Sequence, residues 1–384
     1  MQEYLTALRR DFHAHPEISL QEYRTAEQIE AELDKLSILH ERCGKTGVYA
    51  ELNGTQSGSS VIALRADTDA LAITETQKTE YSSQNNGVMH ACGHDAHTAC
   101  LLGAAKILSD ARDSFGGQVR FFFQPGEEIG GGAKDFIAAG HLEGSKRIFG
   151  LHTASDLPIG TIGVKAGSNN AAVDSFCITI HGFAAHVSTP QKGADALYIA
   201  SQIVVAAQAL TTRRHSPTEP MVIGIGKLTA GTAYNIVAGQ AVLEGTTRTV
   251  TPQTRASVKQ QLTALVRQTA QLYGGEAEIA WTDVTPALIN PKEISKEVQQ
   301  QAAQLPGVTL LTDREISLGG DNFAEYQQLV PGVYAYLGTQ NPNKPNTALP
   351  HHNDGFDIDE SALPYGAALY AQYALWWLQD GGRA

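Results

Sequence analysis

The sequence predicts an α/β protein in which a central, mostly parallel sheet forms the larger domain and a smaller domain is inserted into it. Length is the first indication, because 384 residues exceed what one hydrophobic core usually supports. The second is a set of four apolar segments typical of buried strands, and the third is the helical patterns at 24–36 and 97–108 that lie before and between them. The strand segments are SVIALRAD (60–67), GQVRFFFQP (117–125), RIFGLH (147–152) and GVYAYLGT (332–339).

Each of these predicted strands runs into polar residues. The carboxyl ends of the strands in an open α/β sheet converge on one crevice, where ligands bind. The sequence therefore predicts a polar site at this edge of the sheet. Its candidate residues are Asp67 and Asp69 after the first strand, Glu127 and Glu128 after the second, His152 at the end of the third, and His351 and His352 beyond the fourth.

The middle of the chain has a different pattern, in the order β-α-β-β-α-β. That order is the split βαβ of ferredoxin-like domains. We therefore expect an inserted domain at 174–284, and a larger domain made of 1–173 and 285–384. The predicted elements of the insert are strands at 174–182, 221–231, 240–249 and 276–284, and helices at 193–210 and 252–273.

Composition excludes several classes of partner. The formal net charge of -12, from 40 acidic and 28 basic residues, argues against nucleic acid or an anionic membrane. No apolar run approaches the ~18 residues that span a bilayer, and the first residues lack the apolar core of a signal peptide. We therefore expect a cytoplasmic protein. Its four cysteines lack disulfide spacing, so we expect reduced thiols.

The segment MHACGHDAHT (89–98) places Cys92 and His94 two residues apart, among further groups that can bind metal. A Cys-x-His pair alone is weak evidence. The adjacent carboxylates of Glu127 and Glu128 strengthen it, because they would repel each other unless a cation or a shared proton compensates. Together with the histidines at the other strand ends, they predict a site for one or two divalent ions such as manganese or zinc.

Further motifs are spread over nearly the whole chain. They are RRDFHAHPEISLQEYRTA (9–26), ALRADTDAL (63–71), MHACGHDAHTA (89–99), FQPGEE (123–128), GLH (150–152), GFAAH (182–186), GTTRT (245–249) and HHNDGFDIDESALPYGAA (351–368). With these motifs the sequence resembles a known family, the dinuclear metal amidohydrolases. These include aminoacylases, hippurate hydrolases, auxin-conjugate hydrolases and aminobenzoyl-glutamate hydrolases, and they are relatives of the carboxypeptidase G type enzymes.

The resemblance implies a zinc-peptidase-like catalytic domain with two divalent metal ions per subunit and Glu127 as the catalytic base. It implies His352 rather than His351 as a ligand, because the family ligand usually lies four residues before a phenylalanine, here Phe356. The histidine doublet leaves that choice open. Asp69 resembles the family carboxylate that does not bind the metal itself but orients one of the metal-binding side chains. The implied metal ligands are Cys92, His94, Glu128, His152 and His352.

The resemblance also implies that the inserted domain is a dimerisation or lid domain, and it assigns roles to three of its residues. His186 resembles the family histidine that reaches the active site of the partner subunit and donates to the oxyanion, which implies a homodimer. Asn235 and Arg248 resemble residues that meet the amino-acid end of the substrate. An alternative stays open, in which Arg248 pairs with an acidic neighbour such as Glu244 on the sheet surface and Asn235 only caps a turn.

Some residues lie outside these assignments. We expect His90 and His97 to make structural hydrogen bonds, and we expect Cys43, Cys100 and Cys177 to be small buried side chains. The chain departs from the family at GGDNF (319–323), where many relatives have Gly-Ser-Glu-Asp-Phe. We expect this segment to line the substrate cleft, so it leaves the identity of the substrate open.

These observations predict a metal-dependent amidohydrolase that cleaves the amide bond of a small N-acyl or N-aroyl amino acid. A dipeptidase or small-peptide metallopeptidase with the same site is the closest alternative. A relative that only binds a small ligand is another. The presence of Glu127 argues against it, because a binding protein needs no second carboxylate beside a ligand.

Overall fold

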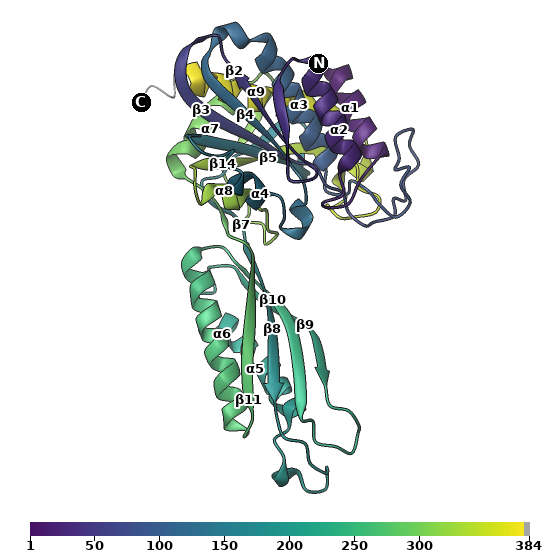
Figure 1. Ribbon diagram of the computed structural model, residues 1–384, viewed down its shortest axis with the longest axis vertical. Coiled ribbons are helices and arrows are strands. Elements are labelled where there is room, and N and C mark those ends of the chain that lie inside the picture. The colour runs from purple at the N-terminus through teal and green to yellow at the C-terminus, as the bar shows by residue number, and fades with distance from the viewer. Residues whose placement is uncertain (380–384) are drawn as a thin grey trace. The chain divides into compact units, whose positions relative to one another are not determined.

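A computed structural model describes residues 1–379, which form two compact units (Figure 1). Unit 1 comprises residues 1–167, 289–315 and 322–379, and unit 2 comprises residues 168–288 and 316–321. The predicted insert at 174–284 lies within unit 2. The sequence did not predict that residues 316–321 belong to unit 2.

Unit 1 is built on an eight-stranded sheet in the order β1-β2-β4-β3-β5-β14-β6-β13. Its centre, β4-β3-β5-β14, is parallel. β1 and β2 pair antiparallel with their neighbours, and β6 pairs antiparallel with β14 and parallel with β13. The strands are β1 (Leu39–Cys43), β2 (Gly47–Asn53), β3 (Gln56–Asp67), β4 (Gly116–Gln124), β5 (Arg147–Pro158), β6 (Thr161–Gly163), β13 (Thr309–Leu311) and β14 (Gly332–Gln340); β7 (Gly167–Asn170) and β12 (Leu288–Asn290) form a separate pair.

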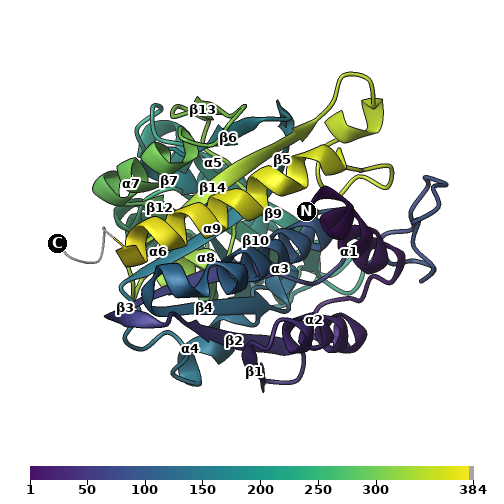
Figure 2. The same cartoon turned by 90° about the horizontal axis from the view of Figure 1, so that it is seen from above.

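Helices cover this sheet, and Figure 2 shows α3 and α9 lying side by side across it. Most side chains of α3 are buried, because α3 packs on β3 of the sheet and against both α1 and α9. Among residues 1–379, no helix combines the length and apolar character needed to cross a membrane. The helices of unit 1 are α1 (Gln2–Ala14), α2 (Tyr23–Lys35), α3 (His94–Asp110), α4 (Ala133–Ala138), α7 (Lys292–Ala302), α8 (Phe323–Gln327) and α9 (Leu363–Gln379), with short 3-10 turns at Arg112–Ser114, Glu127–Ile129, Pro345–Ala348 and Glu360–Ala362.

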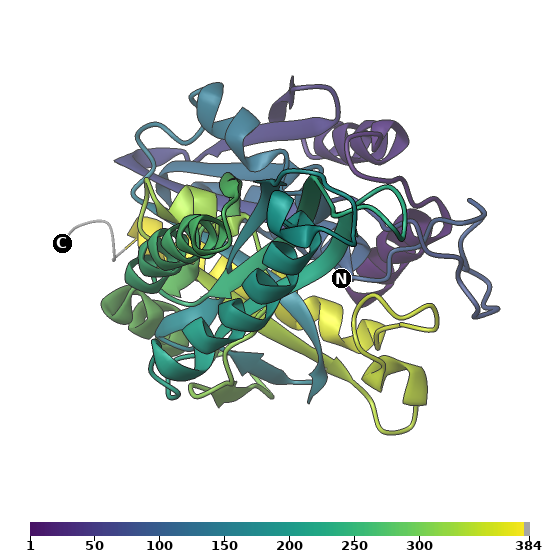
Figure 3. The ribbon, with the colours of Figure 1, turned by 90° about the horizontal axis from the view of Figure 1, so that it is seen from below.

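Unit 2 has the predicted β-α-β-β-α-β order and a fully antiparallel sheet in the order β11-β8-β10-β9. Both helices pack on one face of this sheet over a shared apolar core, and Figure 3 shows them side by side. Asp195 and Thr251 cap the two helices with side-chain oxygens, which satisfies free N–H groups of the first turn. The elements are β8 (Ala172–His181), α5 (Ala196–Arg213), β9 (Met221–Ala230), β10 (Gln240–Thr249), α6 (Pro252–Leu272) and β11 (Glu276–Thr285), with a 3-10 turn at Pro190–Lys192.

The register of the parallel strands brings the predicted polar residues of unit 1 to one edge. Asp67 at the end of β3 pairs with Gln124 at the end of β4, so the residues that follow both strands emerge together. The prediction that the third strand ends at His152 was wrong, because β5 continues to Pro158 alongside β14. Pairing between β3 and β5 stops at Gly150, however, so His152 still lies just beyond the paired segment, level with the end of β3.

Candidate metal centre

The Cys-Gly-His turn positions the first two donors of the predicted metal site. Gly93 has φ 88°, and a Cβ atom there would lie 2.4 Å from the Thr153 hydroxyl. Only glycine fits this left-handed, crowded position. The turn leaves Cys92 before the start of α3 and His94 as its first residue, and both side chains are buried.

The structure brings the five expected ligands together in overlapping groups. Cys92 Sγ lies 3.5 Å from His152 Nε2, His352 Nε2 lies 3.4 Å from Glu128 Oε1, and His94 Nε2 lies 3.8 Å from Glu128 Oε1. Cys92, His94 and His152 offer donor atoms within 4.8 Å of one another, as do Cys92, Glu128 and His352. Mixed sulfur, nitrogen and oxygen donors at this spacing suit divalent zinc or manganese.

Two buried atoms of this cluster indicate that it can hold a cation. Within residues 1–379, His94 Nε2 and Glu128 Oε1 are buried and have no hydrogen-bond partner. Buried polar atoms without partners are rare, since each costs about 1–3 kcal/mol. A bound cation would satisfy both, so the residues present fit a metal centre.

Hydrogen bonds to the other ring nitrogens fix the histidines for coordination. His152 Nδ1 lies 2.7 Å from the Thr153 carbonyl oxygen, and His94 Nδ1 lies 3.2 Å from Asp69 Oδ1. Both partners are acceptors, so Nδ1 carries the proton in each ring. The Nε2 atoms therefore face the cluster, where ligation requires them.

The electrostatics of the cluster also favour a cation. Burial disfavours charge on His94, but the neighbouring Asp67 carboxylate and Cys92 outweigh it and raise the pKa of His94 well above its usual value, so a bound cation would take the place of the proton on Nε2. Burial and the neighbouring Glu128 raise the pKa of the Cys92 thiol. Burial lowers the pKa of His152 well below its usual value, which keeps that ring neutral. A divalent ion would reverse the shift at Cys92, because it stabilises the thiolate.

Asp69 connects the strand-end segments behind these ligands. Its carboxylate accepts from His94 Nδ1, from the backbone N–H groups of Glu127 and Glu128 at 3.1 Å each, and from the Ser19 hydroxyl at 2.6 Å. The residue is 1% exposed. Asp69 therefore orients one histidine and the two-glutamate turn together.

Glu127, the predicted base, lies beside the ligand cluster. Its turn begins after Gly126, which has φ 67°, and it offers a carboxylate oxygen within 4.8 Å of donor atoms of His94 and Glu128. The backbone N–H of Asn322 donates to Glu127 Oε1 at 3.1 Å. We expected the segment that contains Asn322 to line the cleft, but no sequence pattern indicated a contact with the base.

The structure separates the remaining histidines of the site. His351 Nε2 lies 3.4 Å from the Thr153 hydroxyl, whereas His352, which has a positive φ of 66°, lies beside Glu128. His97 makes the expected structural bonds, because its Nδ1 lies 2.5 Å from Asp67 Oδ1 and its Nε2 accepts from the Thr153 N–H.

Two expectations about buried and unassigned residues were wrong. His90 is buried, but neither of its ring nitrogens has a hydrogen-bond partner among residues 1–379. Cys177 is exposed on β8, whereas Cys43 and Cys100 are buried as expected, and all four cysteines are free thiols. Alternation along a half-covered strand places Cys177 on the face without helices.

The predicted residues of unit 2 lie on adjacent loops and on β10. His186 pairs with Ile236 in an isolated bridge, and the Val187 N–H donates to the Asn235 carbonyl oxygen. His186 is exposed, and its Nδ1 accepts from the Ser188 N–H at 3.1 Å, so Nε2 carries the proton. A surface histidine held in this tautomer can donate to a developing oxyanion.

Arg248 is half-buried and donates to the Thr247 carbonyl oxygen at 3.1 Å. The alternative pairing with Glu244 was wrong, because Glu244 binds Lys227 at 2.7 Å. No carboxylate in the described part of the chain pairs with Arg248. Its charge is therefore available to a ligand.

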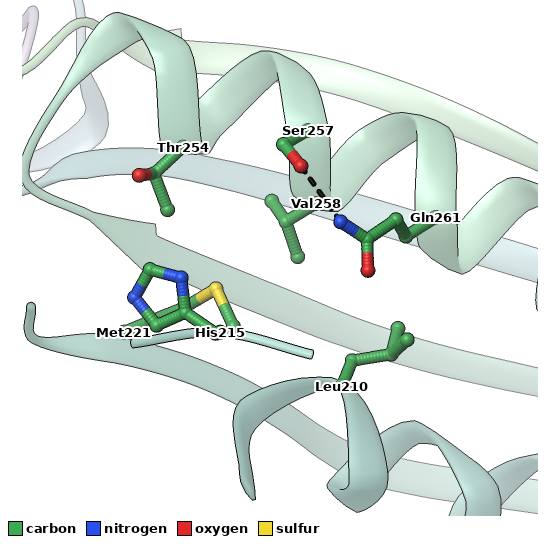
Figure 4. Close-up of a pocket in the computed structure, with 7 residues that line it drawn as sticks. All are labelled: Leu210, His215, Met221, Thr254, Ser257, Val258 and Gln261. Carbon is green, nitrogen blue, oxygen red and sulfur yellow. Dashed lines mark hydrogen bonds between the residues drawn. The ribbon is translucent and has the colours of Figure 1, made fainter. Parts of the chain in front are cut away.

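Unit 2 also contains a small cavity between α5, α6 and β9 (Figure 4). Its volume of about 10 Å³ is roughly the room of one water molecule. The lining residues are Leu210, His215, Met221, Thr254, Ser257, Val258 and Gln261, none of which is a predicted site residue.

Comparison with known proteins decides the family. The model of "Peptidase family M20/M25/M40" matches residues 63–376. The chain belongs to this family. Within it, the chain is 39% identical to an N-acetylcysteine deacetylase of Bacillus subtilis, over 97% of this chain and 96% of that protein. It is 36% identical to a thermostable carboxypeptidase 2 of Saccharolobus solfataricus, over 98% and 95% of the two chains.

A solved structure of the M20 family agrees with the fold. The Bacillus subtilis YXEP protein, described as a dinuclear metal-binding peptidase, matches with a TM-score of 0.87 and 36% identity over 98% of both chains. The matched family segment includes every predicted ligand, the paired glutamates and the three predicted residues of unit 2.

Proposed function

We propose that this M20 protein is a metal-dependent amidohydrolase that cleaves an N-acyl or N-aroyl amino acid into a carboxylic acid and a free amino acid. The observation that carries the proposal is the convergence of sulfur, imidazole and carboxylate donors beside a further carboxylate, Glu127. The similarity to an N-acetylcysteine deacetylase supports the choice of an N-acyl amino acid.

Two divalent ions, manganese or zinc, are the proposed cofactors. Such ions supply Lewis acidity and lower the pKa of water towards ~7, which amide hydrolysis at neutral pH requires. Their ligands would be Cys92, His94, Glu128, His152 and His352. His351 is the less suitable member of the doublet, because its Nε2 faces the Thr153 hydroxyl.

Glu127 is the proposed general base. Its carboxylate takes a proton from the attacking water and passes that proton to the leaving nitrogen. Its neighbour Glu128 is committed to the ligand cluster, so the two adjacent carboxylates divide proton transfer and metal binding between them. Asp69 fixes the positions of the two glutamates relative to each other, because its carboxylate accepts hydrogen bonds from both of their backbone N–H groups.

Unit 2 would complete the site in a homodimer formed through the inserted domain. We assign the oxyanion donor to His186 of the partner subunit, acting through its protonated Nε2. Arg248 and Asn235 would bind the α-carboxylate of the substrate, since a guanidinium fork and an amide donor both suit a carboxylate. A cytoplasmic location and the absence of nucleic-acid or membrane partners remain predictions from composition.

Cleavage of dipeptides or small peptides is the second candidate. The similarity to a thermostable carboxypeptidase favours it, because the same site attacks either amide bond. The two functions differ in the group on the acyl side, which carries a free amine in a peptide.

A substrate panel tests the proposal. Hippurate, N-acetyl-L-cysteine, other N-acetyl amino acids and dipeptides would be assayed with manganese, before and after chelation. We expect the N-acyl amino acids to be cleaved fastest and all activity to disappear on chelation. Dipeptides cleaved at least as fast would favour the peptidase, and activity that survives complete metal removal would refute the mechanism.

A further inference from the structure

Asn322 lies where the chain passes from the 316–321 segment of unit 2 back into unit 1. Its side chain is 1% exposed, and its backbone N–H donates to Glu127 Oε1 at 3.1 Å. The two residues are 195 positions apart in the sequence. A backbone donor therefore reaches the proposed base from a distant segment.

The side chain of Asn322 is anchored at both of its polar atoms. Its Oδ1 accepts from Arg65 Nη2 at 2.9 Å and from Gln124 Nε2 at 2.8 Å. Its Nδ2 donates to the Gly131 carbonyl oxygen at 2.5 Å. Arg65 and Gln124 belong to the paired strands β3 and β4, so these two anchors lie within the central sheet.

From these contacts we propose that Asn322 is a positioning residue that fixes the carboxylate of Glu127 for proton transfer. The proposal rests on the proposed role of Glu127 as the base. One oxygen of a carboxylate held by a fixed N–H sets the plane of the group, which leaves the other oxygen in a defined direction. A general base needs such alignment, because its lone pair must point at the proton it removes.

The anchors explain why the amide side chain is needed for this task. The residues before Asn322 belong to unit 2, so without side-chain anchors only the start of α8 would hold its N–H against Glu127. Gly131 lies just after the turn that carries Glu127, and Gln124 lies just before it. Asn322 thus binds both sides of the loop whose central residue is the base.

The first test compares Asn322→Ala with a matched control, Asn290→Ala. Asn290 is also 1% exposed in unit 1, and its amide bonds the Lys165 and Tyr334 backbones at 2.9–3.0 Å, away from the ligand cluster. We expect both variants to lose similar thermal stability. Asn322→Ala should lose about 10- to 100-fold in kcat, with KM and manganese content little changed, whereas Asn290→Ala should keep its kcat.

The second test asks whether the effect passes through the base. In the Glu127→Gln background, Asn322→Ala should cause little further loss of kcat, because the group that it positions no longer accepts a proton. Asn322→Asp keeps the acceptor for Arg65 and Gln124, so it should retain more kcat than Asn322→Ala.

Three results would overturn the positioning role. They are an unchanged kcat in Asn322→Ala, an equal loss of kcat in Asn290→Ala, and losses that multiply in the double variant. A fully active Glu127→Gln enzyme would overturn the base itself, and the positioning role with it. An impaired Glu127→Gln beside an unimpaired Asn322→Ala would overturn only the positioning role.

Discussion

Replacement of Asp69 by asparagine tests how the metal ligands are held. The carboxylate accepts four hydrogen bonds, two at each oxygen: His94 Nδ1 and the Glu127 N–H at Oδ1, and the Glu128 N–H and the Ser19 hydroxyl at Oδ2. An asparagine amide has one acceptor oxygen, so two donors would face an NH₂ group in either orientation. The variant also loses the negative charge behind His94.

We expect Asp69→Asn to lower manganese affinity by about 10- to 100-fold, the usual cost of removing a partner that orients a metal ligand, or roughly 1.4–2.7 kcal/mol. The ligands themselves remain, so saturating manganese should restore part of the turnover. Ser19→Ala is the matched control. It removes one of the four hydrogen bonds without changing the charge, and it should weaken affinity by less than about 3-fold.

The assay is a manganese titration in competition with a chelating indicator, together with a thermal melt of each metal-free variant. The melt shows whether the variant is folded before its affinity is compared. A folded Asp69→Asn protein with wild-type manganese affinity and turnover would refute the reasoning, because the carboxylate would then have no part in holding His94 or the glutamate turn.

Three further predictions concern unit 2 and acid stability. His186→Ala should lower turnover by about 10²- to 10³-fold with metal content unchanged, and mixed dimers with Glu127→Gln subunits should regain activity; no recovery despite subunit exchange would exclude action across subunits. Arg248→Lys should slow cleavage of carboxylate-bearing substrates by roughly 10-fold and barely affect the matching carboxamides; wild-type enzyme that cleaves amide and acid equally fast would contradict this. Burial opposes ionisation of Asp359, but bonds from Asn341, Ser361 and Lys344 outweigh it and lower its pKa to about 2. Its contribution, about 1–2 kcal/mol, should be complete above pH ~4 and be lost as the pH falls towards 2, so acid unfolding of Asp359→Asn should depend less on pH in that range.

The sequence was sufficient for the architecture because its periodic segments are long and strongly patterned. The strand ending at Asp67 and the order of elements in the insert were predicted from local apolar runs and helical spacing. The end of the strand that contains His152 was not predicted correctly. This strand, β5, is extended by pairing with β14, where Ile148 pairs with Gly332 much further along the chain. Strand length there depends on a neighbour that the local pattern does not reveal.

The candidate site likewise has a part that the sequence predicted and a part that it did not. Its donors could be found because they follow strand ends and match family motifs, whereas contacts made by loop backbone could not. The Asn322 N–H that binds Glu127 depends on a loop conformation, and the side chain that holds it is satisfied by Arg65 and Gln124 on other strands. His90 shows the opposite error, since a histidine beside ligands was expected to have a partner and has none in the described residues.

The central claim is that metal binding and proton transfer reside on different side chains of one site. Metal analysis and kinetics on Glu127→Gln and Cys92→Ala test it most directly. We predict that Glu127→Gln keeps the wild-type metal content while its turnover falls by roughly 10²- to 10⁴-fold, and that Cys92→Ala loses metal. Loss of metal from Glu127→Gln, or full metal occupancy in Cys92→Ala, would contradict the account.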